Sequence, residues 1–313
     1  MALVKKRLSL GFTVFVSLLL LCVASTRLIS GPASDDEKRL LVSTSWLAEH
    51  MHDPSVVVFH VASSRRDYLN GHIPGSMFLW TQSLSQNTPD LSLELPSMAQ
   101  ADSVLRNLGI NDGVHIVLYF SSGNVSPTTR IFMTLEYLGL GGHVYLLDGG
   151  LDAWRADGHP IAKEITTAKH GSYKIHERSD VVVDCDFVKA SLANPHVSIV
   201  DARGAQFYNG TSAGMARSGH IPGAVNIPFT TLVDSTNKLK DKKALETIFR
   251  EAGVKPGNTI VAYCHIGQQA TLVYFTASYL GYDVRLYDGS FDDWGGREEL
   301  PIVNPAAENA QKK

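Results

Sequence analysis

The sequence predicts an α/β protein built from two tandem domains, each a mostly parallel sheet flanked by helices. Two observations point to this fold class: the chain repeats itself once, and short apolar, β-branched segments alternate with helical ones in both copies. Its 313 residues are 44% hydrophobic and 19% charged, which is ordinary for a globular protein of two medium-sized domains. The net charge of −3 gives no reason to expect a nucleic-acid partner.

Three pairs of matching segments reveal the repeat, in the same order in both copies. "NGHIPGSMFLW" returns as "SGHIPGAVNIPF", and "LEYLGLGGHVYLLDGGLDAW" returns as "ASYLGYDVRLYDGSFDDW". "LVSTSWLAEH" corresponds to "VVDCDFVKAS". The offset is about 140–150 residues, which is the length of a domain. We therefore expect an N-terminal domain over 37–160, an aperiodic linker over 161–180 and a C-terminal domain over 181–304.

Each copy is expected to contain the same elements in the same order. A helix opens at a residue typical of N-caps, Ser43 or Thr44 in the first copy and Asp184 in the second. A buried strand, the GHIPG turn, a helix, a second buried strand, a loop, another helix and a last strand follow. The expected strands cover 55–61, 114–120 and 143–149 in the first copy and 197–202, 258–264 and 283–289 in the second; the helices before the second strands cover 101–110 and 243–254.

The N-terminus is predicted to be an export signal. Three basic residues at 5–7 precede an apolar stretch at 8–25 that ends in small residues, so we expect a signal peptide over 1–24 and a periplasmic or secreted protein. One alternative is an uncleaved membrane anchor, because the apolar run is near the length of a membrane span. Another is lipidation of Cys22, which the bulky residue before it disfavours.

The duplication serves as an internal control, because features of both copies belong to the fold and features of one copy are candidates for chemistry. His72 and His220 of the two GHIPG turns are therefore expected to be structural hydrogen-bonding residues. Trp154 and Trp294 are expected to be packing aromatics for the same reason.

The loop after the second strand of each copy is where the copies differ. "VAYCHIGQQATLVYF" places Cys264 at the end of an apolar strand, whereas "IVLYFSSGNVSPTTRIF" has Phe120 there and a longer loop. A phenylalanine cannot act as a nucleophile, and Ser121 and Ser122 have no evident base in the sequence. The first copy is therefore expected to be catalytically silent.

Cys264 is predicted to be a reactive thiol. It follows a parallel strand at its carboxyl end, where open α/β sheets place their sites. The next six residues form a tight loop in which Gly267 can take a positive φ, and a helix then begins near Gln269–Ala270 and runs to Leu280. Loop N–H groups and the positive helix end would favour the thiolate, so we expect a lowered pKa and a cradle for anionic sulfur. The cradle residues are His265, Ile266, Gly267, Gln268, Gln269 and Ala270.

Cys185 has a different expected role. It aligns with Thr44 or Ser45 near a helix start, so we interpret it as a small residue of the capping region. An exported chain could join Cys185 and Cys264 in a disulfide, but a core of this size does not need one, and we expect two free thiols.

With these residues identified, the chain resembles a tandem-domain rhodanese, the family of thiosulfate and 3-mercaptopyruvate sulfurtransferases. The resemblance covers roughly residues 37–304, and its carriers are the duplicated GHIPG turn, the "YC" strand end with its six-residue loop, and "YDGSFDDW". It implies a silent N-terminal domain paired with an active C-terminal one.

The resemblance implies covalent sulfur transfer at Cys264. The thiolate would take the outer sulfur of thiosulfate, or alternatively of 3-mercaptopyruvate, and pass it from a persulfide to cyanide or a thiol. The implied partners are these small molecules, without a metal or organic cofactor; a membrane is expected only if the N-terminal segment stays attached.

The donor-binding residues fit the family pattern only in part. The family's "Asp-x-Arg" is present as Asp201 and Arg203, but the substrate-binding arginine usual four residues later is Phe207. Arg217 is the candidate to supply the missing charge, with a solvated surface arginine as the alternative. His265 and Ile266 match neither the basic pattern of thiosulfate enzymes nor the Gly/Ser pattern of mercaptopyruvate enzymes.

Two other functions would also use a cysteine in such a loop. A cysteine-dependent phosphatase also cradles an anion after a strand, but it needs an arginine six residues after the cysteine, where this chain has Ala270. A non-enzymatic persulfide carrier or sensor would keep Cys264 and its loop, and turnover with small-molecule substrates would distinguish it from an enzyme.

Overall fold

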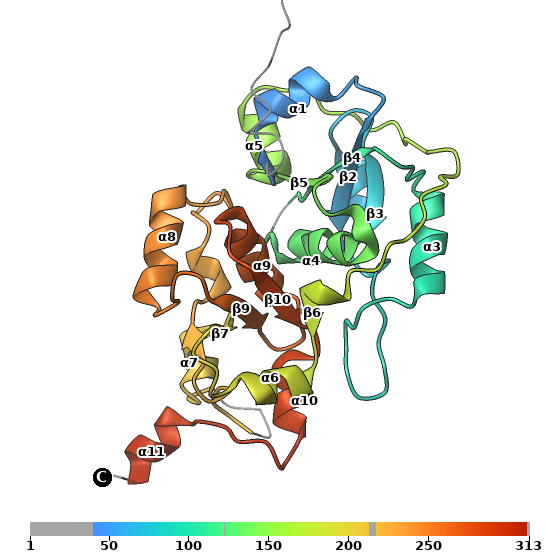
Figure 1. Ribbon diagram of the computed structural model, residues 1–313. Helices are drawn as coiled ribbons and strands as arrows, with labels where there is room; N and C mark the ends of the chain where they lie inside the picture. The colour runs from blue at the N-terminus through green and yellow to red at the C-terminus, as the bar shows by residue number, and fades with distance from the viewer. Residues whose placement is uncertain (1–39, 122, 213–216, 312–313) are drawn as a thin grey trace, which may run out of the picture. The chain divides into compact units, whose positions relative to one another are not determined.

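Two five-stranded parallel sheets form the frame of the protein (Figure 1). The computed structural model describes residues 40–311 apart from 122 and 213–216. The predicted signal peptide over 1–24, with Cys22, lies outside the described residues, as does Ser122, so export stays a prediction. Among the described helices, none has the length and apolar character needed to span a membrane.

The two sheets have the same strand order, which confirms the predicted α/β duplication. The first runs β1-β5-β4-β2-β3 and the second β6-β10-β9-β7-β8, with all neighbours parallel. The short edge strands were not predicted, because two to four residues carry no periodicity. The strands are β1 (Leu41–Val42), β2 (Val56–Ala62), β3 (Met77–Trp80), β4 (His115–Tyr119), β5 (Val144–Leu147), β6 (Val182–Val183), β7 (Val197–Asp201), β8 (Val225–Asn226), β9 (Thr259–Tyr263) and β10 (Val284–Tyr287).

Helices connect the strands as expected for parallel sheets. The predicted caps are confirmed: Ser43 accepts a hydrogen bond from the Trp46 N–H, and Asp184 from the Phe187 N–H. The helices are α1 (Thr44–His50), α2 (Arg65–Asn70), α3 (Met98–Asn107), α4 (Ser126–Leu135), η2 (Glu136–Leu140), α5 (Gly150–Ala156), η3 (Ser179–Val181), α6 (Cys185–Ser191), α7 (Ala205–Tyr208), η4 (Phe229–Thr231), α8 (Lys242–Glu251), α9 (Ala270–Tyr279), α10 (Ser290–Gly296) and α11 (Pro305–Gln311).

The hydrophobic residues form three cores, one of them shared by the two copies. Each sheet has its own core on one face, under α1 and α5 in the first copy and under α6 and α10 in the second. The opposite faces contribute to a single core together with α3, α4, α8 and α9. Side chains alternate along β9, so Ala262 and Cys264 belong to the shared core. Tyr263 belongs to the outer core of the second copy, which lies on the other face of the sheet under α6 and α10.

Helices α4 and α9 pack against each other in the shared core (Figure 1). The Thr129 and Thr271 hydroxyls lie 2.8 Å apart, and the Phe132 and Phe275 rings meet edge to face with centroids 4.9 Å apart. Each of these helices begins just after the loop in which the two copies differ. The packing therefore brings the first copy close to the loop of Cys264.

Two further contacts tie each copy to the other in a symmetric way. Asp148, which follows β5, accepts a hydrogen bond of 2.9 Å from the Leu239 N–H of the second copy. Asp288, which follows β10, accepts one of 2.9 Å from the Leu95 N–H of the first copy. The two aspartates occupy matching positions in the repeat, so each copy fixes a loop of its neighbour.

The shared motifs have the structural roles predicted for them. His72 and His220 hydrogen-bond through Nδ1 to the carbonyls of Tyr68 and Tyr208, each at 2.8 Å. The linker 161–178 contains no helix or strand and runs back along the first copy, where the Ala162 N–H donates to the His72 carbonyl. Trp154 and Trp294 are fully buried, and each donates its indole N–H to a proline carbonyl.

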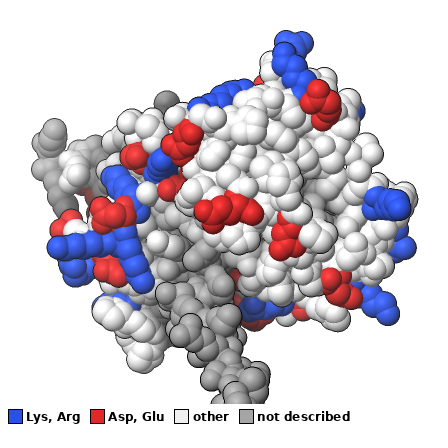
Figure 2. All heavy atoms as spheres, turned by 90° about the horizontal axis from the view of Figure 1, so that it is seen from above, with Lys and Arg blue, Asp and Glu red and all other residues white. Residues whose placement is uncertain are grey.

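Charged side chains of both signs are mixed on the molecular surface. On the face in Figure 2, Lys and Arg side chains lie among Asp and Glu side chains. This distribution agrees with the small net charge of the sequence.

Candidate active site

Cys264 lies directly after β9 at the carboxyl end of the second sheet, where sequence analysis placed it. Only 1% of the residue is exposed, and its thiol is free, as is that of Cys185. Its backbone is held on both sides: the Cys264 N–H donates to Ser290 Oγ at 3.2 Å, and its carbonyl accepts from the Phe291 N–H at 3.0 Å. The sulfur therefore sits on a fixed segment of backbone.

The start of α9 directs backbone N–H groups toward the sulfur. No side chain caps this helix, so its first donors are not satisfied in the usual way. The N–H groups of Ala270, Ile266 and Gln269 instead hydrogen-bond to Cys264. This arrangement is a cradle for negative charge on sulfur, and three of the six predicted loop residues supply its donors.

The predicted direction of the Cys264 pKa shift is wrong. Burial raises the pKa of the thiol above its ordinary value, and the nearby Asp201 carboxylate adds to this. The three backbone N–H groups lower the pKa but only oppose the effect of burial. The sequence revealed the donors of the loop but not the extent to which the sulfur is removed from water.

Alkylation of Cys264 by iodoacetamide should reflect this raised pKa. Only the thiolate reacts, so the alkylation rate follows the fraction of thiolate. In the folded protein we expect this rate still to rise with pH at values where the rate for the same cysteine in the urea-unfolded chain has already reached its plateau. The measurement is peptide-resolved alkylation kinetics over about pH 6–10, around the ordinary thiol pKa. Peptide resolution separates Cys264 from Cys22 and Cys185. A plateau at lower pH in the folded protein than in the unfolded chain would contradict the expectation.

Gly267 is the residue that permits the tight loop. Its φ is +72°, a conformation that side chains rarely adopt. A Cβ there would lie 2.7 Å from the Asp288 carbonyl oxygen and 2.9 Å from Arg130 Nη1. The loop is therefore pressed against both residues, and only glycine fits.

In the described part of the corresponding loop of the first copy, which leaves out residue 122, the backbone donors are arranged differently. Ser126 N–H is capped by Asn124 Oδ1 at 2.8 Å, Pro127 has no N–H, and Thr128 N–H donates to the Val125 carbonyl at 2.9 Å. The donors at the start of α4 are thus used locally. Together with Phe120 in place of the cysteine, this supports the prediction that the first copy is silent.

Asp201 and Arg203 form a fully buried ion pair whose carboxylate is close enough to Cys264 to affect its pKa. Arg203 Nε and Nη2 donate to the Asp201 carboxylate, with the shortest contact at 2.6 Å, and Nη2 also reaches the Gly219 carbonyl at 2.7 Å. Tyr263 donates its hydroxyl to Asp201 at 2.8 Å. Arg203 Nη1 is buried and has no hydrogen-bond partner among the described residues. The pair thus leaves one unused donor on a residue that sequence analysis assigned to substrate binding.

His265, the first residue after Cys264, packs against Phe207. Their rings meet edge to face with centroids 4.5 Å apart. Burial, followed by the Arg203 charge, lowers the pKa of His265 despite opposition from Asp292 and Asp201. The lowered pKa favours the neutral form of His265.

The structure uses Arg217 elsewhere. Its Nη1 donates to the Arg297 carbonyl at 2.7 Å, and its Nη2 to the Leu300 carbonyl at 2.6 Å. Both terminal nitrogens hold the segment after α10, so these contacts give no support to the prediction that Arg217 binds the substrate.

Sequence analysis missed Ser290, whose Oγ fixes the Cys264 backbone and donates to the Tyr287 carbonyl at 2.9 Å. Ser290 has φ +54°, and its counterpart in the first copy, Gly150, has φ +58°. A serine in this unfavourable conformation is thus specific to the copy that contains the cysteine. The signal was present in the sequence, as "DGS" in the second copy against "DGG" in the first.

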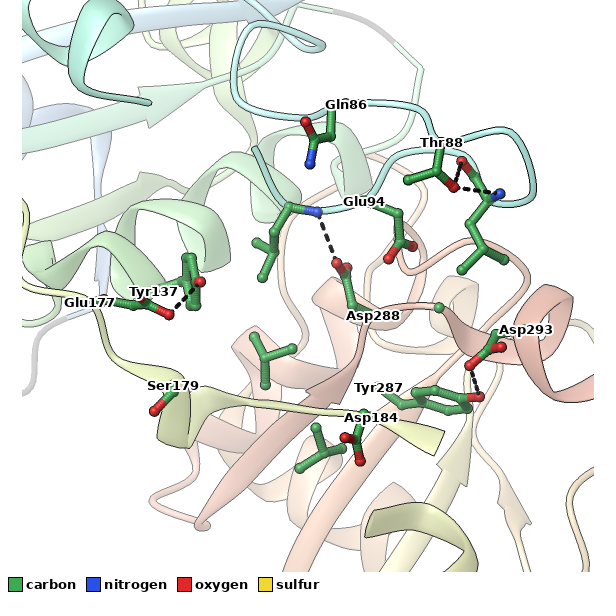
Figure 3. A pocket seen from close by; sticks show the side chains of 15 residues that line it. Gln86, Thr88, Glu94, Tyr137, Glu177, Ser179, Asp184, Tyr287, Asp288 and Asp293 are labelled. Carbon is green, nitrogen blue, oxygen red and sulfur yellow. Dashed lines mark hydrogen bonds between the residues drawn. The ribbon is translucent and has the colours of Figure 1, made fainter. Parts of the chain in front are cut away.

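A pocket of about 470 Å³ is lined by Asp288 and by residues of both copies (Figure 3). Carboxylates from both copies face it, among them Glu94, Asp184 and Asp293. Burial and the charges of Asp288 and Asp293 raise the pKa of Glu94 to about 7, against the opposing charge of Arg130. Among the described residues, no group of His, Cys, Asp and Glu is arranged to hold a metal ion.

Two stretches of the chain, 43–157 and 184–297, match the model of the rhodanese-like domain. The chain belongs to the rhodanese-like family. Its two rhodanese-like domains correspond to the two copies, and the resemblance stated from the GHIPG turns and the Cys264 loop is confirmed.

Two relatives show the kind of activity found in this family. The rhodanese-like chain is 32% identical over 275 residues to a 3-mercaptopyruvate sulfurtransferase of Escherichia coli (strain K12), covering 83% of this chain and 96% of the relative. It is 28% identical over 264 residues to a thiosulfate sulfurtransferase of Azotobacter vinelandii, covering 84% and 96%.

A solved structure supports the same assignment. The crystal structure of a 3-mercaptopyruvate sulfotransferase from Escherichia coli superposes with a TM-score of 0.73 at 32% identity, covering 80% of this chain and 98% of the other. The rhodanese-like chain is therefore a sulfurtransferase, which confirms the enzyme class expected from its sequence.

Proposed function

We propose that this sulfurtransferase moves a sulfane sulfur through a persulfide on Cys264. The observation that carries the proposal is the cradle at the start of α9, where three backbone N–H groups converge on one buried sulfur. Such donors stabilise an anionic sulfur whether it is the thiolate or the outer sulfur of a persulfide attached to it. The cradle also excludes water, which strengthens each of these hydrogen bonds.

The reaction has two steps. The Cys264 thiolate attacks the outer sulfur of the donor, a new S–S bond forms, and the donor's bond to that sulfur breaks. Its electron pair leaves with sulfite when the donor is thiosulfate, or with the enolate of pyruvate when the donor is 3-mercaptopyruvate. A thiolate or cyanide then attacks the outer sulfur and releases the Cys264 thiolate, which restores the enzyme.

Both donors carry negative charge, and Arg203 is the residue we assign to them. Its Nη1 is a buried donor with no hydrogen-bond partner in the described part of the chain, while its other nitrogens are fixed by Asp201 and Gly219. A buried N–H without a partner is costly and is satisfied by an anionic oxygen. Thiosulfate is the donor that we expect, with 3-mercaptopyruvate as the alternative.

Mass spectrometry of the protein after exposure to each donor tests the proposal. We expect one adduct of about 32 Da on the Cys264 peptide with the true donor. Sulfinic acid adds nearly the same mass, so cyanide is added afterwards: it removes a persulfide as thiocyanate and leaves a sulfinic acid unchanged.

Three outcomes of this experiment would count against the proposal. No adduct with either donor, an adduct on Cys185 alone, or one that resists cyanide would each overturn the assignment of Cys264. A persulfide that forms once and is never transferred to cyanide or a thiol would instead identify a carrier.

A further inference from the structure

The silent copy places one buried arginine against the catalytic loop. Arg130 belongs to α4 and is 1% exposed. Its Nη1 donates to the Gly267 carbonyl at 3.3 Å and to Asp288 Oδ1 at 2.5 Å, and its Nη2 donates to the Leu93 carbonyl at 2.6 Å. One guanidinium thus joins two segments of the second copy to one of the first.

Arg130 contacts Gly267, which lies in the middle of the loop that forms the cradle. Gly267 stands between Ile266 and Gln269, both of which donate N–H groups to the sulfur. The hydrogen bond from Arg130 to the Gly267 carbonyl fixes the orientation of that peptide. The packing against Arg130 also leaves no space for a side chain at position 267. The guanidinium therefore constrains the stretch of loop between these two donors.

Arg130 also influences the backbone of Cys264 indirectly, through Asp288. Asp288 is held by Arg130 on one carboxylate oxygen and by the Leu95 N–H on the other (Figure 3 shows the second contact). Two residues later, Ser290 Oγ accepts the Cys264 N–H. Arg130 thus stabilises both the loop after Cys264 and the segment that holds Cys264 in place.

The repeat shows that this arginine is not required by the fold. Thr129 and Thr271 are counterparts whose hydroxyls meet, so the next residues, Arg130 and Leu272, are counterparts too. Leu272 is 1% exposed and lies in the shared core. The fold therefore accepts an apolar residue at this position, and the arginine is found in the copy that faces the catalytic loop.

We propose that Arg130 is a positioning residue for Cys264, which it serves by fixing the Gly267 peptide and Asp288. The silent copy thereby contributes to sulfur transfer without touching the sulfur. This inference rests on the proposed role of Cys264 as the reacting group. The charge of Arg130 is balanced by Asp288, so its effect is exerted through the geometry of the loop.

Variants of Arg130 and Asp288 test the inference, with their repeat counterparts as matched controls. Arg130→Lys keeps the charge beside Asp288, but a single ammonium cannot replace the fork that also holds the Gly267 and Leu93 carbonyls. Arg130→Met with Asp288→Asn removes both charges, so that no unpaired carboxylate is left buried. The controls are Leu272→Met and Asp148→Asn, at the matching positions of the repeat.

Two readouts are compared in the full-length protein, the pH dependence of Cys264 alkylation and kcat/KM for sulfur transfer. We expect both Arg130 variants to shift the alkylation profile to higher pH, because misaligned N–H donors stabilise the thiolate less. We expect kcat/KM to fall about 10- to 100-fold, as for other losses of alignment near a reacting group. The control variants should stay within about twofold of the wild type.

The results distinguish this inference from the proposed function. Folded Arg130 variants with an unchanged alkylation profile and unchanged kcat/KM, even if less stable to urea, would show that Arg130 is only structural. Equal losses in Leu272→Met would likewise overturn the inference, because the effect would then belong to α4–α9 packing. A wild-type protein that transfers no sulfur would refute the proposed function, while its alkylation profile would still decide the role of Arg130.

Discussion

Replacing Cys264 with serine is expected to abolish sulfur transfer, with a loss in kcat/KM of more than ~10³-fold. A serine hydroxyl has no thiolate form to attack the donor and cannot carry the sulfane sulfur between the two steps. The substitution leaves the volume of the buried site nearly unchanged, so the variant should fold. The measurement is thiocyanate formation from each donor with cyanide as acceptor, together with a urea unfolding curve.

Cys185→Ser provides the matched control for this experiment. Cys185 is also a buried free thiol, but it starts α6 and belongs to the outer core of the second copy. Burial raises the pKa of its thiol, which the nearby Tyr287 hydroxyl opposes. We expect activity within about twofold of the wild type, as for most substitutions away from a site. Transfer that persists in Cys264→Ser and disappears in Cys185→Ser would reverse the assignment.

Arg203→Met is expected to have the second largest effect, on stability and on donor binding together. It leaves Asp201 buried without its ionic partner, and breaking a buried pair costs about 3–5 kcal/mol. It also removes the Nη1 donor that we assign to the substrate, so the KM for the donor should rise at least ~10-fold while the KM for the acceptor stays the same. Urea unfolding and steady-state kinetics with varied donor measure the two effects separately.

A double variant keeps this prediction testable if the single variant does not fold. Asp201→Asn with Arg203→Met removes both charges and should regain part of the lost stability, because no uncompensated carboxylate remains. Its KM for the donor should stay high. A folded double variant with the wild-type KM for the donor would exclude Arg203 from the donor site.

The frame of the fold could be predicted from the sequence because its signals are local. Apolar runs such as 258–264 mark the buried strands, Ser43 and Asp184 mark helix starts, and the repeat fixes the number of domains. Cys264 was identified in the same way, since its place after a strand and before a short loop can be read directly. Two-residue strands such as β1 and β6 depend on pairing with a distant partner, and no local pattern reports it.

The properties of the site were predictable only where they depend on nearby residues. The loop donors to Cys264 follow from the start of α9, but the pKa of the thiol depends on burial by both copies, which the sequence does not show. Arg217 looked available for substrate because its acceptors, the carbonyls of Arg297 and Leu300, are about 80 residues away in sequence.

Arg130 and Ser290 were missed for a different reason. Both residues differ from their counterparts in the other copy, Arg130 from Leu272 and Ser290 from Gly150, but neither difference by itself indicates a nucleophile. What the sequence could not supply is the contact of Arg130 with Gly267, because that contact joins residues of different copies.

The packing of α9 has a consequence for how the chain evolves and unfolds. Every residue of α9 from Ala270 to Ala277 is buried, within a core to which both sheets contribute. Separating the copies would expose this helix to water, so we expect them to melt as a single cooperative unit. We therefore expect the first copy to stay under selection for stability alone, because its loss would expose the helix that follows Cys264.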